Sequence, residues 1–142
     1  MVESRNPRPG GYQPRQETIA SDVQDGDLKS IILQGDAVKL NEVANRLGGY
    51  YASGKEGEKL SASQIRGILD HLQRMYQFRH ADLQLLRPKL AYAAGRHGGK
   101  VSELQKVADR AIVMVDTDEK RFENFRNFFE AIVAYHRYHG GK

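Results

Sequence analysis

Apolar side chains recur at intervals of three and four residues from about residue 27 to the end of the chain. In the clearest stretch, one helix face would carry every large apolar residue: Ile65, Ile68, Leu69, Leu72, Met75 and Tyr76. This spacing matches the 3.6-residue turn of an α-helix, and no alternating segment competes with it. The sequence therefore predicts an all-α fold, a compact single-domain bundle of five to six helices.

The first 25 residues lack this periodicity. They hold three of the four prolines together with Arg5, Arg8 and Arg15. Such a segment has little apolar surface to bury against a core. We therefore expect residues 1–25 to form a flexible, basic, Pro/Gly-rich arm and residues 26–142 to form the helical bundle domain.

Glycines and capping residues predict where the first helices begin and end. One helix is expected from Asp27 to Gly35, and a second from Asp36 to a break at Gly48–Gly49. The next start is marked by Ser61 and Gln64, which have the spacing of a capping box. Leu60 and Ile65 flank this pair at the two positions of a hydrophobic staple.

Three further segments predict the rest of the bundle. A helix is expected over residues 82–96, where Pro88 should either open a second segment or bend a continuous one. Ser102 is predicted to cap the following helix. The last helix carries a stripe of aromatic residues that we interpret as core, namely Phe122, Phe125, Phe128 and Phe129.

Composition excludes several classes of protein. The chain has 142 residues, 39% of them hydrophobic, which is enough for one core without cross-links. It has no cysteine, so thiol catalysis, disulfide scaffolds and thiolate metal sites are excluded. No apolar run has the roughly 20 residues that a membrane span needs. The N-terminal residues are polar, so a soluble, cytoplasmic protein without a signal peptide is expected.

The excess of basic over acidic residues lies in the second half of the chain. The formal net charge is +4, and residues 61–142 hold 14 Lys/Arg against 9 Asp/Glu. No acidic residue lies between Asp82 and Glu103. An excess of cations without nearby carboxylates attracts phosphates and polyanions, so charge alone makes nucleic acid a candidate partner.

Within this acid-free stretch, Lys89, Tyr92 and Arg96 have spacings of three and four and therefore share one helix face. That face could hold consecutive phosphates with an aromatic ring beside them. The structural alternative is that Tyr92 borders the core and the two cations merely flank it. Arg66 and Arg74 lie four residues on either side of Asp70, which is typical of ion pairs on an ordinary helix surface.

Catalytic and metal-binding patterns are weak. His136 and His139 could face one metal ion, but no third ligand follows from the sequence, and histidine is also favoured in the last helical turn. Glu130 lies among apolar residues and is expected to be partly buried, most simply with a structural role. No glycine-rich phosphate loop or nucleophile elbow is present. We therefore predict a protein that is not an enzyme and has no cofactor or bound metal.

Three segments resemble a known family: LSASQIRGILDHLQRM, LRPKLAYAAGRHGG and FRNFFEAIVAYHRYHGG. They are similar, in the same order, to the small subunit of type III-A CRISPR effector complexes, the Csm family. The resemblance covers most of residues 60–141 and none of the first 25. It implies an all-helical, non-catalytic subunit, present in several copies, that packs along the guide-RNA filament and lines the channel for target RNA.

The resemblance also implies the partners. These are guide RNA, target RNA, the backbone and large subunits of the complex, and other copies of the chain, with no membrane. Each copy would contact RNA phosphates while base pairing with the guide reads the sequence. The expected RNA-binding residues are Arg66, Lys89, Tyr92, Arg96, His97 and Arg126.

Two other function classes stay open from the sequence. One is a stand-alone helical nucleic-acid-binding protein of the architectural kind, in which the arginines of residues 1–25 would contribute to binding. The other is a metal-dependent enzyme that uses His136 and His139.

Overall fold

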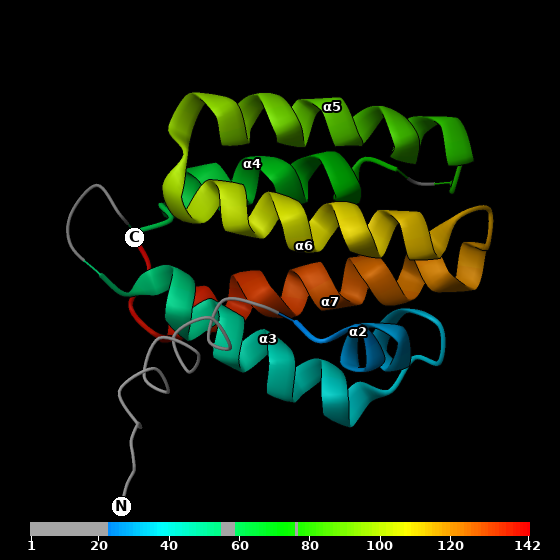
Figure 1. Ribbon diagram of the computed structural model, residues 1–142, viewed down its shortest axis with the longest axis horizontal. Coiled ribbons are helices and arrows are strands. Elements are labelled where there is room, and N and C mark those ends of the chain that lie inside the picture. Colours follow the sequence, from blue (N-terminus) through cyan, green and yellow to red (C-terminus); the bar gives the residue numbers. More distant parts are fainter. Residues whose placement is uncertain (1–22, 55–58, 76) are drawn as a thin grey trace, which may run out of the picture.

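A computed structural model of the chain describes residues 23–54, 59–75 and 77–142. The described part contains six helices and no strand, which confirms the all-α bundle (Figure 1). Most of the predicted arm, residues 1–22, lies outside the described residues. The helices are α2 (Asp25–Ile32), α3 (Ala37–Ala52), α4 (Ala62–Gln73), α5 (His80–His97), α6 (Gly99–Val115) and α7 (Glu119–Tyr138).

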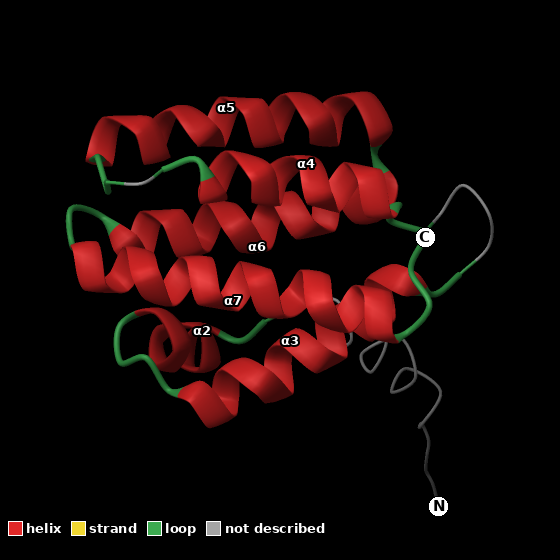
Figure 2. Cartoon of the chain, turned by 180° about the vertical axis from the view of Figure 1, so that it is seen from behind, coloured by secondary structure: helices red, strands yellow, loops and turns green. Residues whose placement is uncertain are grey.

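Helix α7 is the centre of the bundle and packs against α2, α3, α4 and α6. Its apolar residues recur every three or four positions, and they are almost completely buried, as predicted: Phe122, Phe125, Phe128, Phe129 and Ile132. Burying a side chain of this size contributes about 1.5–3 kcal/mol to folding. Figures 1 and 2 show α7 in the middle layer, with α2 and α3 on one side and α4, α5 and α6 on the other.

Two of the helix starts expected from capping residues form as predicted. The Asp36 carboxylate accepts a hydrogen bond from the Lys39 amide at 3.0 Å, at the start of α3. The Ser61 hydroxyl accepts from the Gln64 amide at 3.2 Å, and the Gln64 side chain accepts in return from the Ser61 amide at 2.9 Å. The capping box at α4 is therefore confirmed, and both staple residues are buried.

The break predicted at Gly48–Gly49 is wrong, because α3 continues through both glycines to Ala52. A Cβ atom at residue 48 would lie 2.6 Å from the His136 amide nitrogen of α7. Gly48 therefore lets the backbones of α3 and α7 approach closely, rather than ending the helix. The contact with α7 outweighs the low helix propensity of glycine.

The start of α6 also differs from the prediction. The helix begins at Gly99, and its N-cap is Gly98 with a φ of +64°, so Ser102 lies inside the helix instead of capping it. The left-handed conformation of Gly98 turns the chain directly from α5 into α6. Pro88 lies within the single helix α5 and does not open a new segment.

Candidate nucleic-acid interface

The face predicted from Lys89, Tyr92 and Arg96 is exposed in the structure. Tyr92 is 70% exposed, so it is not a core residue, and both cations are exposed beside it. The opposite face of α5 packs on α6 through buried apolar side chains, namely Leu83, Leu86, Leu90 and Ala94. The amphipathic spacing of α5 thus separates a buried apolar face from an exposed basic and aromatic one.

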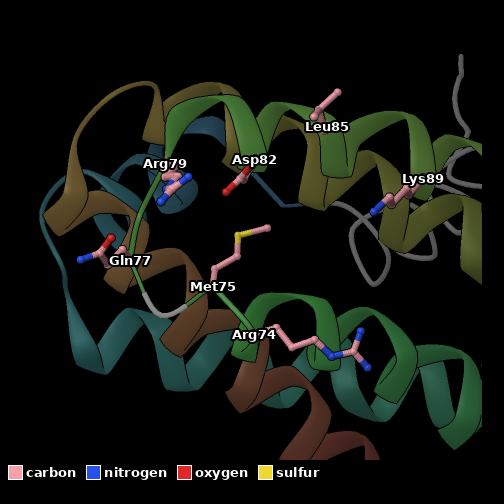
Figure 3. Close-up of a pocket in the computed structure, with 7 residues that line it drawn as sticks. All are labelled: Arg74, Met75, Gln77, Arg79, Asp82, Leu85 and Lys89. Carbon is pink, nitrogen blue, oxygen red and sulfur yellow. The ribbon is translucent and has the colours of Figure 1, made fainter.

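Helices α4 and α5 run side by side (Figures 1 and 2). A groove lies between the C-terminal end of α4, the segment that follows it and the first half of α5. It has a volume of about 610 Å³ and combines three cations, one carboxylate and apolar surface (Figure 3). We call it the α4–α5 groove. Its lining residues are Arg74, Met75, Gln77, Arg79, Asp82, Leu85 and Lys89.

The two helices leave this space because each packs mainly on a different neighbour. Helix α4 contacts α7, whereas α5 contacts α6. In Figure 3, Met75 extends into the gap between the two helices, and Lys89 and Asp82 reach toward it from α5. Leu85 points away and forms part of the rim.

The cations of the groove differ from Arg87 and Arg110, which are paired with carboxylates. Arg87 forms a two-bond ion pair with Asp109, at 2.6 and 3.1 Å, and Arg110 contacts Asp25 at 2.6 Å. Within the described residues, no hydrogen bond or ion pair of the side chain is found for Arg74, Arg79 or Lys89. The groove therefore holds positive charge that the fold does not neutralise, which is the electrostatic requirement for binding phosphate.

Two of these cations also affect the pKa of His71. Burial lowers the pKa of the His71 imidazole, and the positive charges of Lys89 and Arg74 lower it further. Lys89 and Arg74 come from different helices, yet both repel a proton at the same ring. Two of the cations that line the α4–α5 groove therefore act on the His71 ring in the same direction, while Asp70 acts in the opposite one.

The other predicted RNA contacts lie apart from one another. Arg66 is exposed on α4 but does not line the groove, and His97 is exposed at the last position of α5. Arg126 is half-buried on α7, where it donates to the Met75 carbonyl at 3.2 Å and lies 5.0 Å from the Phe122 ring centre. The structure thus places Lys89, Tyr92 and Arg96 on the exposed face of α5, whereas Arg126 contacts Met75 and Phe122.

Sequence reasoning missed Arg74 and Arg79 as members of this surface. The Arg66–Asp70–Arg74 spacing predicts ordinary ion pairs on a helix surface, but none of these three residues forms an ion pair within the described chain. No local signal could have found Arg74, because its neighbour Lys89 lies on another helix. Arg79 is the N-cap residue of α5, before the first helical turn, so the helical spacing within α5 does not place it either.

The two histidines that the metal-dependent alternative would use have contacts within the fold. His136 is buried with its Nε2 atom 2.7 Å from the Leu60 carbonyl oxygen, and the Nε2 atom of His139 lies 2.6 Å from Asn45 Oδ1. Among the residues described, no three His, Cys, Asp or Glu side chains gather in a way that could hold a metal ion. Glu130 is exposed rather than partly buried, which corrects the expectation from its apolar neighbours.

No helix in the described part of the chain is long and apolar enough to cross a bilayer. Comparison with curated proteins and with solved structures finds no match. The family model described as Csm2 Type III-A matches residues 34–142, a range that includes α3 to α7 and the whole α4–α5 groove. This match confirms the resemblance seen in the three sequence segments. The chain belongs to the Csm2 family, the structural small subunits of type III-A CRISPR effector complexes.

Proposed function

We propose that this protein is a non-catalytic small subunit that lies in several copies along the guide-RNA filament and binds the target-RNA backbone through the α4–α5 groove and the exposed face of α5. The observation that carries the proposal is a set of three cations that line one groove and have no carboxylate partner among the described residues, Arg74, Arg79 and Lys89. Exposed Tyr92 and Arg96 continue this surface along α5.

The mechanism is electrostatic positioning. Lysine and arginine contacts to phosphates fix an RNA strand without reading its sequence, which the guide reads by base pairing. The few cations of one copy would bind weakly. Repetition along a filament converts each further contact into an intramolecular one, so the assembled complex binds much more tightly than one subunit.

The same proposal specifies the partners and the compartment. The backbone and large subunits, further copies of this chain and guide RNA would form the assembly, in the cytoplasm. Target cleavage would belong to other subunits, and this chain would supply binding surface only.

The test is a double variant, Lys89→Ala with Arg96→Ala, in the reconstituted effector complex. Both side chains are exposed, so the fold and the subunit ratio should be preserved. Target RNA should bind more weakly regardless of its sequence, and the slope of log affinity against log salt should fall by about one for each phosphate contact removed.

The matched control is Lys29→Ala, which removes one exposed charge from α2, on the far side of the bundle from α5 (Figure 1). It should leave both the affinity and the salt slope unchanged. A double variant that behaves like this control would show that the α5 face does not bind RNA. An isolated native chain that binds RNA as tightly as the whole complex does would instead favour the stand-alone nucleic-acid-binding protein.

A further inference from the structure

We propose that Arg126 is a positioning residue of the α4–α5 groove, because it holds the segment between α4 and α5 in place from α7. This role rests on the RNA-binding function proposed above. Arg126 would then affect RNA binding without touching RNA. The segment, which we call the connector, comprises the described residues Arg74, Met75, Gln77, Phe78 and Arg79.

The connector supplies four of the seven residues that line the α4–α5 groove, including two of its cations, Arg74 and Arg79. Figure 3 shows it passing from the end of α4 to the start of α5. Helix α4 packs on α7 and helix α5 packs on α6, so packing between α4 and α5 does not fix the connector. Its position depends instead on its own contacts with the rest of the bundle.

The first of these contacts is a hydrogen bond from α7. The Nη1 atom of Arg126 donates to the Met75 carbonyl oxygen at 3.2 Å. The same guanidinium lies 5.0 Å from the centre of the Phe122 ring, one helical turn earlier on α7. The negative face of an aromatic ring attracts a cation, so Phe122 helps to hold the guanidinium in place. Since Met75 adjoins Arg74, the hydrogen bond restrains the backbone that carries this groove cation.

The second contact uses the same aromatic ring. Phe78 stacks on Phe122 with the two ring centres 5.0 Å apart and the ring planes 26° from parallel. Phe122 is 1% exposed, so its ring is fixed by the core, whereas Phe78 is half-buried. Phe78 directly precedes Arg79 in the chain. One core ring therefore connects Arg126 to both ends of the connector.

A third contact holds the residue that follows the connector. The Nδ1 atom of His80, the first residue of α5, lies 2.8 Å from the Asp116 carbonyl oxygen in the turn between α6 and α7. These contacts together keep the connector ordered before RNA arrives. A phosphate that binds Arg74 and Arg79 then does not have to order this backbone, which avoids an entropic cost of binding.

The experiment measures target-RNA binding by the reconstituted effector complex with Arg126→Ala at several salt concentrations. Loss of preorganisation should weaken binding by about 3- to 10-fold. The slope of log affinity against log salt should stay native, because Arg74, Arg79 and Lys89 can still bind phosphates. A direct phosphate contact by Arg126 would instead lower this slope by about one.

The chain offers a closely matched control in Arg121→Ala. Arg121 is also a half-buried arginine of α7, and its Nη1 atom also donates to a carbonyl oxygen at 3.2 Å. This bond ends on Met114 of α6 rather than on the connector, and Arg121 does not line the groove. Arg121→Ala should therefore keep the native affinity and the native salt slope.

A second variant, Phe78→Leu, loosens the connector without removing any charge. It should weaken RNA binding in the same way as Arg126→Ala. The two changes combined should cost less than the product of their separate losses, because the second acts on a connector that is already loose. Carbon-13 NMR of the Met75 methyl group in the free, full-length chain checks the loosening directly. Its signal should shift in both variants and stay in place in Arg121→Ala.

The outcomes separate the positioning role from the proposed function. The positioning role is overturned if Arg126→Ala binds RNA like the native chain while Lys89→Ala with Arg96→Ala binds it more weakly. It is also overturned if Arg126→Ala lowers the salt slope by about one and Phe78→Leu has no effect, which would make Arg126 a direct phosphate contact. Native binding by the Lys89 and Arg96 double variant would instead refute the proposed function, and the positioning role with it.

Discussion

Arg87 and Lys89 lie two residues apart on α5 but have different surroundings. Arg87 faces α6, where Asp109 holds its guanidinium with two hydrogen bonds and raises its pKa. Lys89 faces the α4–α5 groove, where its charge is not paired with a described carboxylate. A rotation of about 200° around the helix therefore separates a cation that joins two helices from one that is available to a ligand.

The same comparison applies to Lys100, the last cation of the acid-free stretch. Its ammonium group donates to the Tyr50 carbonyl at 2.7 Å and lies 4.3 Å from the centre of the Tyr50 ring. Lys100 therefore attaches the end of α3 to the start of α6. Basic charge in the sequence indicated a binding surface, but part of that charge holds the fold together.

A prediction at the residue scale concerns His71. Replacing Lys89 or Arg74 by alanine should raise the pKa of the imidazole toward its ordinary value of 6.5, because each cation disfavours the protonated ring. Asp70 acts in the opposite direction, and its replacement by asparagine should lower the pKa further. Proton NMR titration of His71 measures these shifts, and Lys29→Ala should leave the pKa unchanged.

The sign of the linked stability change follows from the lowered pKa. The unfolded chain binds a proton at His71 more readily than the folded chain does, so stability should fall as the pH decreases through about 6.5. His71→Gln should reduce this loss of stability between neutral and mildly acidic pH. Denaturation curves at both pH values provide the measurement, and an equal loss in the variant would contradict the assignment.

At the scale of single helices, capping predicts a stability difference between two serines. Ser61→Ala removes the acceptor for the Gln64 amide and should cost about 1 kcal/mol in the free energy of unfolding. Ser102→Ala should be neutral or slightly stabilising, because Ser102 lies inside α6, where alanine has the higher helix propensity. Urea denaturation of both variants makes the comparison, and equal destabilisation would show that the box contributes nothing of its own.

Helix packing predicts a similar contrast between two glycines. A methyl group at Gly48 would lie 2.6 Å from the His136 nitrogen in the backbone of α7, so Gly48→Ala should cost about 1–3 kcal/mol. Gly67→Ala places its methyl group in open space on α4 and should stabilise the protein by about 1 kcal/mol. Thermal or urea unfolding distinguishes the two, and a neutral Gly48→Ala would mean that α3 can move away from α7 without cost.

At the scale of the whole molecule, packing on α7 sets the positions of the other helices. It takes α3 and α2 on one side and α4 and α6 on the other, so α5 reaches the bundle mainly through α6. Helices α4 and α5 then lie next to each other without close packing between them. The groove is the result of this arrangement, and its cations come from two helices that each look unremarkable in isolation.

The sequence by itself determined the helical fold, the capping box at Ser61, the aromatic core of α7 and the single helix face that carries Lys89, Tyr92 and Arg96. All of these depend on residues within about one or two helical turns of each other, whose relative positions the 3.6-residue period sets. Only the tertiary structure decided that Arg74 and Arg79 join Lys89, that Gly48 continues a helix and that Arg126 supports Met75. A helical pattern shows which face of a helix is buried, but the neighbouring helix that covers it depends on how the whole chain packs.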